Sequence, residues 1–339
     1  MGSDNDVVFS LCKQMSSNNG QLCSNNDDVL HDFAPFIRIY KDGRIERLAG
    51  NEIVPPTISD PKTGVSSKDV IIVPETGVSA RLFLPKITHS SDQKLPLLIY
   101  IHGGGFCIET PFSPMYDSYV SSLVAEAKVV AVSIHYRRAP EHLLPIAYDD
   151  SWAVIQWMAS HSNRKGTESW LNNHADFQRV SIMGDSAGAN IAHNMVVRAT
   201  ETPLEGVRFV GLGLIHAFFH EEEPVGPEVS DEEMKAKTTK LWRVVCPSTI
   251  GCNDPLINPA ACTNLKRLAC KRVVVCVAEK DPLIGGPLFY HKTLHKSGWE
   301  GEMELMEVQG ESHVFHLFNP TNDKAVAMKT RLASFLNSD

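Results

Sequence analysis

Two short strings of residues have the types and spacing that acyl transfer by a serine nucleophile requires. Residues 184–188 read Gly-Asp-Ser-Ala-Gly and match G-x-S-x-G, in which the serine sits on a sharp turn between a strand and a helix. Residues 102–106 read His-Gly-Gly-Gly-Phe, a loop of the HGGG type whose backbone N–H groups can face a developing oxyanion. Either string alone can arise by chance. Together, each just after an apolar run, they predict Ser186 as a nucleophile beside an oxyanion site.

A serine hydroxyl is a poor nucleophile unless a base takes its proton and an acid orients that base. In the order Ser…Asp/Glu…His, both partners follow later strands of the chain. Asp281 is the predicted acid, and Glu279 is its rival, closer to the end of the preceding apolar run. His313 is the predicted base, because it follows the next apolar run and a glycine turn. His316 is an alternative that we expect to have a packing or hydrogen-bonding role.

The expected oxyanion site combines the glycine-rich loop with the residue after the serine. Its members are Gly103, Gly104, Gly105 and Ala187. The N–H groups of the last three are the expected donors, and the first shapes the loop. Losing one such donor typically lowers the rate by on the order of 10². We expect His102 to hold the loop by hydrogen bonding and Asp185 to support the turn locally.

The elements that must position these residues follow a clear order. Expected strands lie at 95–101, 128–135, 179–183, 207–215, 272–277 and 303–308, and they alternate with helical stretches at 114–127, 147–160, 186–199, 284–297 and 322–337. Two hairpins come first, pairing 36–40 with 45–48 and 70–73 with 78–84. Antiparallel strands followed by this alternation predict an α/β fold, with a mostly parallel central sheet and helices on both faces.

The polar N-terminal stretch and one interruption of the alternation suggest a lid. We interpret residues 1–32 as a flexible segment that forms part of the lid, and residues 33–339 as the α/β domain. An insert at about 219–250 carries an expected helix at 230–245. Ser230 and Glu233 form a capping box at its start. The run of three glutamates at 221–223 is interpreted as a solvated loop.

Composition excludes several classes of function. The chain has 339 residues and a formal net charge of -8, so we expect no nucleic-acid partner and no anionic membrane surface. It contains no apolar run long enough to cross a membrane and no signal-peptide pattern at its start. The eight cysteines form no C-x-x-C pair, which favours free thiols in a reducing cytoplasm. The oligomeric state cannot be read from the sequence.

Beyond these motifs, the chain resembles the plant carboxylesterase group of the hormone-sensitive-lipase-like α/β hydrolases. The resemblance runs from about residue 33 to the C-terminus, through 37–48, 63–70, 78–85, 102–106, 136–142, 147–150, 170–176, 184–190, 297–299 and 313–320. It implies the α/β-hydrolase fold and a serine esterase without a cofactor, with a helical lid built from the N-terminal segment and the insert. Gibberellin receptors resemble this fold but lack the catalytic histidine, whereas His313 is present here.

Three places depart from the pattern of that group. The usual His-Pro-(Tyr/Phe)-Phe-Trp-Gly is replaced by His-Ala-Phe-Phe-His at residues 216–220, at the base of the expected lid. Residues 283–286 replace a basic stretch, and Arg138 stands where an apolar residue is usual. Candidate substrate-lining residues are Phe106, Phe218, Phe219, Trp242, Leu283 and Phe315, each equally explained as ordinary core.

Three hypotheses for the function follow. The first is a carboxylesterase that hydrolyses small to medium carboxylic esters of plant specialised metabolites through an acyl-enzyme. The second is a dehydratase, lyase or cyclase of isoflavonoid or alkaloid metabolism that uses the same pocket, because the resemblance to 2-hydroxyisoflavanone dehydratases runs along the chain. The third is a ligand receptor with a vestigial site. In each case the expected partner is a small molecule.

Overall fold

The computed structural model describes residues 28–87, 93–220, 232–251 and 253–338, and it divides into two compact units, 1–51 and 52–339. The described part of the first unit is a three-stranded antiparallel sheet of β1 (Val29–Phe33), β2 (Ile37–Tyr40) and β3 (Ile45–Arg47). The predicted hairpin between 36–40 and 45–48 is therefore confirmed. β1 falls largely within the expected flexible segment; it was not predicted, and it gains its backbone partners from β2. The lid role of residues 1–32 stays a prediction.

The second unit is built around an eight-stranded sheet. Its strands are β4 (Ser66–Val73), β5 (Val78–Leu84), β6 (Leu95–Ile101), β7 (Val130–His135), β8 (Ala175–Asp185), β9 (Phe209–Ile215), β10 (Arg272–Ala278) and β11 (Glu302–Val308). Their order is β11-β10-β9-β8-β6-β7-β5-β4, and all neighbours from β11 to β7 are parallel. β5 pairs antiparallel with both β7 and β4. The predicted mostly parallel sheet is confirmed.

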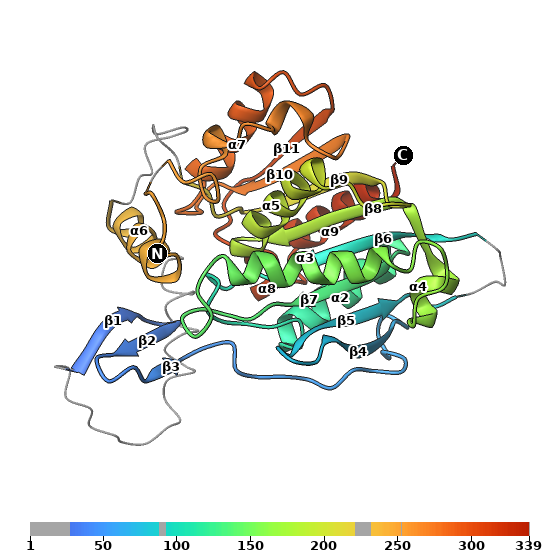
Figure 1. Cartoon of the computed structure of the whole chain (residues 1–339), viewed down its shortest axis with the longest axis horizontal. Helices are drawn as coiled ribbons and strands as arrows, with labels where there is room; N and C mark the ends of the chain where they lie inside the picture. Colours follow the sequence, from blue (N-terminus) through green and yellow to red (C-terminus); the bar gives the residue numbers. More distant parts are fainter. Residues whose placement is uncertain (1–27, 88–92, 221–231, 252, 339) are drawn as a thin grey trace. The chain divides into compact units, whose positions relative to one another are not determined.

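Helices cover both faces of this sheet, as predicted (Figure 1). They are α2 (Pro114–Ala127), α3 (Ile146–Ala159), α4 (Ser169–His174), α5 (Ala187–Glu201), α6 (Glu232–Val245), α7 (Gly285–Lys296), α8 (Phe315–Phe318) and α9 (Asp323–Asn337), with short 3-10 turns η3 (Pro259–Ala261) and η4 (Leu265–Arg267). α3 packs on α5 on one face, and α2 packs on α8 and α9 on the other. The short helices α4 and α8 were not predicted, because a segment of four to six residues is too short to show a helical repeat of apolar residues.

Four carboxyl ends of parallel strands bring the predicted site residues to one edge of the sheet. β6 leads into the glycine-rich loop and β8 leads into Ser186, and the ends of these two strands pair through Ile101 and Gly184. β10 precedes Asp281 and β11 precedes His313, and these strands also pair at their ends. Because the carboxyl ends of parallel strands meet at one edge, residues far apart in sequence lie close together there.

The predicted insert at about 219–250 contains one described helix, α6, close to the expected 230–245. The run 221–223 and the predicted cap at Ser230 lie outside the described residues. The C-terminal end of α6 is fixed to the loop before α3, because the N–H of Leu144 donates to the carbonyl of Val245 at 2.9 Å. Whether α6 acts as a lid stays a prediction.

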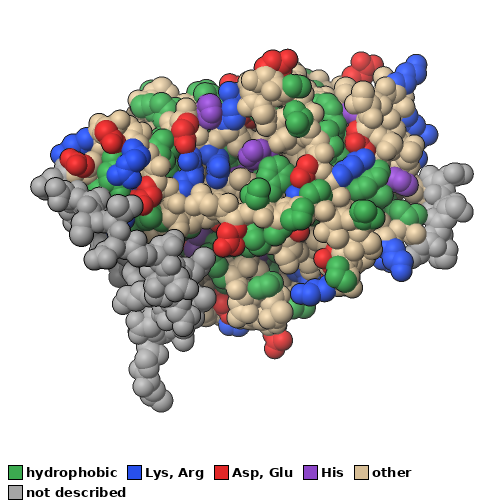
Figure 2. Space-filling model, turned by 90° about the horizontal axis from the view of Figure 1, so that it is seen from below, with side chains coloured by type: hydrophobic (Ala, Val, Ile, Leu, Met, Phe, Trp, Pro, Cys, Tyr) green, Lys and Arg blue, Asp and Glu red, His purple; other side chains and the backbone are tan. Residues whose placement is uncertain are grey.

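Acidic and basic side chains are mixed on the face drawn in Figure 2. Elsewhere in the described chain, solvent-accessible side chains form ion pairs, such as Arg331 with Glu304 at 2.6 Å and Arg198 with Asp149 at 2.8 Å. Such exposed pairs contribute little to stability. None of the helices in the described ranges is long and apolar enough to span a membrane.

Arg81 on β5 provides a stability test, because its side chain is only 1% exposed. It donates to both carboxylate oxygens of Asp69 at 2.8 and 2.9 Å and to Asp117 at 2.9 Å. Arg81→Met removes the cation and leaves partly buried carboxylates unpaired, so we expect a loss of about 3 kcal/mol in the free energy of unfolding. The exposed Arg331→Met should lose less than about 1 kcal/mol. Equal losses in urea unfolding would contradict this account.

Candidate active site

Ser186 stands on a strained turn between β8 and α5. Its φ of 51° and ψ of -120° lie where residues other than glycine are rare. Two backbone hydrogen bonds hold the turn: the N–H of Ser186 donates to the carbonyl of Ile215 at 2.9 Å, and the N–H of Phe218 donates to the carbonyl of Ser186 at 3.0 Å. A Cβ at Gly188 would lie 2.1 Å from the carbonyl oxygen of Ile101, so only glycine fits there.

A line of hydrogen bonds joins Ser186, His313 and Asp281. The Nδ1 of His313 lies 2.8 Å from Oδ2 of Asp281, and its Nε2 lies 3.0 Å from Oγ of Ser186. A carboxylate only accepts, so Nδ1 carries the proton of the neutral ring. Nε2 then accepts, and the Ser186 hydroxyl donates to it. The structure thus brings the three predicted residues together in the geometry that proton transfer from the serine requires.

Asp281 and His313 stabilise each other's charged forms. Burial raises the pKa of Asp281, but the charge and hydrogen bond of His313 outweigh burial and hold that pKa below its ordinary value. Burial lowers the pKa of His313, but Asp281 outweighs burial and raises it. Above this raised pKa the imidazole is neutral and can accept the proton of Ser186. A proton on His313 is then stabilised by the carboxylate beside it.

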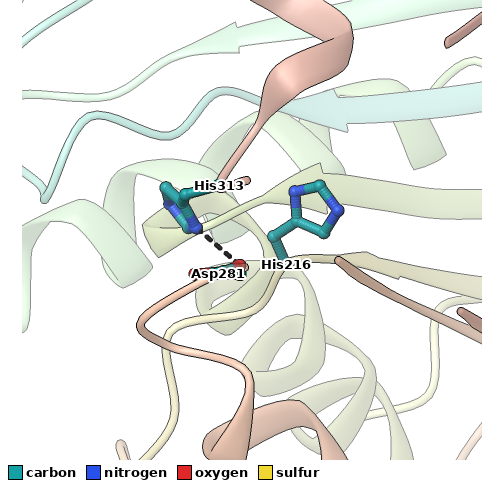
Figure 3. A group of neighbouring side chains, drawn as sticks. All are labelled: His216, Asp281 and His313. Carbon is teal, nitrogen blue, oxygen red and sulfur yellow. Dashed lines mark hydrogen bonds and ion pairs between the residues drawn. The ribbon is translucent and has the colours of Figure 1, made fainter. Parts of the chain in front are cut away.

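His216, which sequence reasoning did not single out, lies beside this pair, as Figure 3 shows. Its Nδ1 accepts the N–H of Val314 at 2.8 Å, which fixes the residue that follows His313. Burial lowers the pKa of His216 to about 4, so its ring is neutral at pH 7. In the sequence it directly follows the apolar run of β9 and is the first residue of the segment 216–220 that was compared with the pattern of the resembling group.

The ligand atoms of His216, Asp281 and His313 lie within 4.8 Å of one another, a spacing that a metal ion also requires. Their hydrogen bonds use the same atoms, however. With Nδ1 of His216 accepting from Val314, the proton of its neutral ring is on Nε2 and no lone pair remains there. Both nitrogens of His313 are occupied by Asp281 and Ser186. The donor set therefore suits proton transfer better than metal binding.

Three backbone N–H groups of the predicted oxyanion site, those of Gly104, Gly105 and Ala187, donate to no atom of the residues described. The N–H of Gly103 differs, because it donates to the hydroxyl of Tyr116 at 2.9 Å. Gly103 is therefore occupied with holding the loop, whereas the three other N–H groups remain able to bind an anionic oxygen.

Two other histidines considered in the sequence, His102 and His316, do not hydrogen-bond Ser186, and burial disfavours the protonated ring of each. His102 is buried, its ring stacks on Tyr136 at 4.3 Å between centroids, and burial lowers its pKa to about 3. His316 lies in α8, packs on Tyr119 at 4.8 Å, and has its pKa lowered well below the ordinary value by burial. The rival acid Glu279 is exposed and accepts the N–H of Gly310 at 2.6 Å, whereas Asp281 is the acid that bonds His313.

Four of the six candidate lining residues border one cleft beside the site. Its walls are Phe218, Phe219, His220, Thr238, Thr239, Trp242, Arg243, Gly251, Ile257 and Leu283. Phe106 is buried behind this wall, with its ring 5.9 Å from that of Phe218 and 6.0 Å from that of Trp242. Phe315 instead packs against His216 at 5.7 Å.

Comparisons with known proteins agree with this geometry. Residues 98–317 match a protein family described as having the alpha/beta hydrolase fold. The chain is 45% identical over 316 residues to tuliposide A-converting enzyme 1, chloroplastic, of Tulipa gesneriana. This match covers 93% of this chain and 80% of the relative. It is 43% identical over 317 residues to probable carboxylesterase 5 of Arabidopsis thaliana, a match that covers 91% of this chain and 98% of the relative.

It is also 42% identical over 316 residues to 2-hydroxyisoflavanone dehydratase of Glycine max, covering 91% of this chain and 99% of that one. Among solved structures, an esterase of Pyrobaculum calidifontis matches with a TM-score of 0.64 at 24% identity. That match covers 80% of this chain and 84% of the other, and it shows that the two share a fold.

The coupling between His313 and Asp281 predicts a change in ionisation. Asp281→Asn removes the charge that raises the pKa of His313 and leaves burial to lower it, so the pKa of His313 should fall below that of the unmodified protein. Glu279→Gln is the matched control and should leave this pKa unchanged, because its side chain bonds Gly310 instead. An NMR titration of the imidazole measures both. A fall of the same size in both variants would refute the pairing.

Proposed function

Because this chain is a member of the plant carboxylesterases of the hormone-sensitive-lipase-like α/β hydrolases, and is a carboxylic ester hydrolase, we propose that it forms an acyl-enzyme on Ser186. The proposed substrates are small to medium carboxylic esters of plant specialised metabolites. The observation that carries the proposal is the unbroken line of hydrogen bonds from Asp281 through His313 to Ser186, with lengths of 2.8 and 3.0 Å.

In the proposed first step, Oγ of Ser186 attacks the ester carbonyl while Nε2 of His313 takes the hydroxyl proton. The carbonyl oxygen becomes an oxyanion that accepts from the N–H groups of Gly104, Gly105 and Ala187. As the intermediate collapses, the carbon–oxygen bond to the alcohol breaks, and His313 gives its proton to the leaving alcohol. The products are the free alcohol and an ester of Ser186.

In the second step, water attacks the acyl-enzyme. His313 takes a proton from the water, and the same three N–H groups stabilise the second oxyanion. Collapse releases the carboxylic acid and returns the proton to Ser186. Asp281 keeps the imidazole in the required tautomer and stabilises its charged form throughout. Apart from the ester and the water, every group in these two steps belongs to the chain, so the proposed mechanism needs no cofactor.

The cleft beside Phe218 and Trp242 is the proposed site for the larger part of the substrate. Five of its ten lining residues are aromatic or aliphatic, which favours a moderately apolar group in the substrate. Two residues that line the cleft also contact the proposed catalytic residues through their backbone: the N–H of Phe218 donates to the carbonyl of Ser186, and the N–H of Leu283 donates to Asp281 at 2.8 Å. Small-molecule substrates of this kind require no nucleic acid and no membrane as partners, and we propose the cytoplasm as the location.

A second candidate function is an elimination or cyclisation in isoflavonoid or alkaloid metabolism, favoured by the 42% identity to 2-hydroxyisoflavanone dehydratase. There His313 would remove a proton from carbon, and the oxyanion donors would stabilise the resulting enolate without an ester of Ser186. Intact-protein mass spectrometry during turnover distinguishes the two reactions. An acylated Ser186 that forms and decays at the rate of turnover supports hydrolysis, and product formation without it supports the alternative.

Ser186→Ala tests the proposed nucleophile. Without the hydroxyl no acyl-enzyme forms, so kcat for p-nitrophenyl acetate should fall by on the order of 10⁴ or more. Ser312→Ala is the matched control, since the Ser312 hydroxyl makes only a long 3.4 Å bond to the carbonyl of Lys280. It should keep kcat within about twofold. Full activity in Ser186→Ala would exclude the proposed mechanism.

Leu283→Trp tests the proposed cleft. The larger side chain narrows the space, so KM for p-nitrophenyl butyrate should rise by roughly tenfold and KM for the acetate should rise less. The backbone N–H of Leu283 that donates to Asp281 at 2.8 Å is unaffected by the change. Val326→Trp on α9 is the control, because Val326 is exposed and does not line the cleft. Equal changes in KM for both esters would argue against this binding site.

A further inference from the structure

A buried chain of hydrogen bonds runs from Asp185, the residue before the proposed nucleophile, to the glycine-rich loop. The hydroxyl of Tyr116, in the first turn of α2, lies 2.7 Å from Oδ2 of Asp185, and the hydroxyl of Tyr100 lies 2.9 Å from Oδ1. The N–H of Gly103 donates to the same Tyr116 hydroxyl at 2.9 Å. The side chains of all three polar residues are 2% exposed or less.

Each hydrogen in this chain has only one possible direction. Burial raises the pKa of Tyr116 and of Tyr100 well above the ordinary value of 10.0, so both phenols keep their protons. Burial raises the pKa of Asp185 to about 6, against the lowering effect of the two phenols, so the carboxyl is ionised above that pH. The carboxylate must accept from both phenols. Tyr116 therefore has its lone pairs free for the N–H of Gly103.

This chain of bonds fixes the loop against the turn that carries Ser186. A Cβ on Gly103 would lie only 2.4 Å from Oδ2 of Asp185, which shows how closely the loop approaches that carboxylate. From the other side, the hydroxyl of Tyr136 lies 3.0 Å from the carbonyl oxygen of His102 and 3.2 Å from that of Gly103. Gly103 is thus held by hydrogen bonds at both its backbone N–H and its backbone C=O.

The fixed position of Gly103 determines the directions of the N–H groups of the next two residues, Gly104 and Gly105. The N–H of Gly103 is used by Tyr116, whereas the N–H groups of Gly104 and Gly105 make no bond within the described chain. A loop with Gly103 released could turn its N–H toward the substrate oxygen, or turn the following two away from it. An oxyanion site works only when its donors are oriented before charge develops.

We propose that Tyr116 is a positioning residue of the oxyanion site, which links the Asp185 carboxylate to the N–H of Gly103 and thereby directs the N–H groups of Gly104 and Gly105 toward the reacting oxygen. This inference rests on the proposed function for the role of those donors. It assigns to Asp185 a second task besides supporting the turn, because the carboxylate orients the Tyr116 hydroxyl.

Tyr116→Phe and Tyr100→Phe form a matched pair of variants. Each removes one buried hydroxyl and one bond to Asp185, but only the first releases Gly103. With p-nitrophenyl acetate, kcat per active site should fall about 10²-fold in Tyr116→Phe with KM within about twofold, as when one oxyanion donor is lost. Tyr100→Phe should keep kcat within about threefold. Equal kcat in the two variants would overturn the proposal.

A transition-state analogue separates positioning from general damage to the fold. A trifluoromethyl ketone adds to Ser186 and gives a tetrahedral oxyanion, so its inhibition constant should rise in Tyr116→Phe by the same factor as kcat/KM falls. Titration with an organophosphate gives the fraction of folded active sites. A loss of activity explained by that fraction alone, with an unchanged inhibition constant, would overturn the positioning role.

The rate of Ser186 phosphorylation by paraoxon distinguishes failure of this inference from failure of the proposed function. Attack of Ser186 on phosphorus also places negative charge on an oxygen that the loop must bind, and p-nitrophenolate leaves. If wild-type protein hydrolyses no ester, the proposed function fails, but phosphorylation must still be slower in Tyr116→Phe than in Tyr100→Phe. Equal phosphorylation rates refute the inference itself.

If Tyr116→Phe does not fold, Asp185→Ala provides a second test. Without the carboxylate the Tyr116 hydroxyl loses the acceptor that orients it toward the N–H of Gly103. We expect kcat to fall by at least about tenfold, with the organophosphate-titrated fraction unchanged. Wild-type kcat in this variant would count against the proposal.

Discussion

The close approach of two backbones at Gly188 is the constraint on which the whole site depends. Gly188 lies in the first turn of α5, and a Cβ on it would be only 2.1 Å from the carbonyl oxygen of Ile101. That contact lets the turn at Ser186 sit directly beside the loop that starts after Ile101. The proposed nucleophile and the glycine-rich loop follow strands that pair through Ile101 and Gly184, so the register of the sheet brings the two segments together. The strand before the turn and the helix after it hold Ser186 in its strained backbone conformation.

Two buried carboxylates then divide the electrostatic work of the proposed mechanism. In the proposed mechanism His313 takes the proton of Ser186 and becomes positively charged beside Asp281. The charge and hydrogen bond of His313 hold the pKa of Asp281 below its ordinary value. Burial raises the pKa of Asp185 to about 6, because it outweighs the hydrogen bonds of the two phenols, the charge of His313 and the N–H of Gly103, which all lower that pKa. One carboxylate thus keeps its charge for the imidazole, and the other uses its charge to order hydroxyl groups. Asp185 ends β8, and Asp281 follows the end of β10 by three residues. The two carboxylates have different proposed tasks because different groups donate hydrogen bonds to them.

The sequence was sufficient to predict the strands, the long helices and the order of the site residues, because continuous apolar runs and glycine strings are local signals. It did not predict β1, whose exposed and half-buried alternation becomes a strand only by pairing with β2. Nor did it indicate Tyr116 or His216. Tyr116 lies in a helix turn 69 positions before Asp185, and a buried tyrosine in a helix looks like ordinary core. Its role depends on which carboxylate lies within reach, and that is decided by the sheet order.

The segment after β9 shows how the site can change specificity without losing its geometry. The ring of His216 accepts the N–H of Val314, and the backbone of Phe218 holds the carbonyl of Ser186. Both contacts support the hydrogen-bonded line to Asp281. Phe218, Phe219 and His220 also line the cleft. Because support comes from one ring and one backbone amide, the cleft-facing side chains can vary independently of the line. The unusual histidine at position 220 is therefore a change in the proposed binding surface that leaves the proposed chemistry untouched.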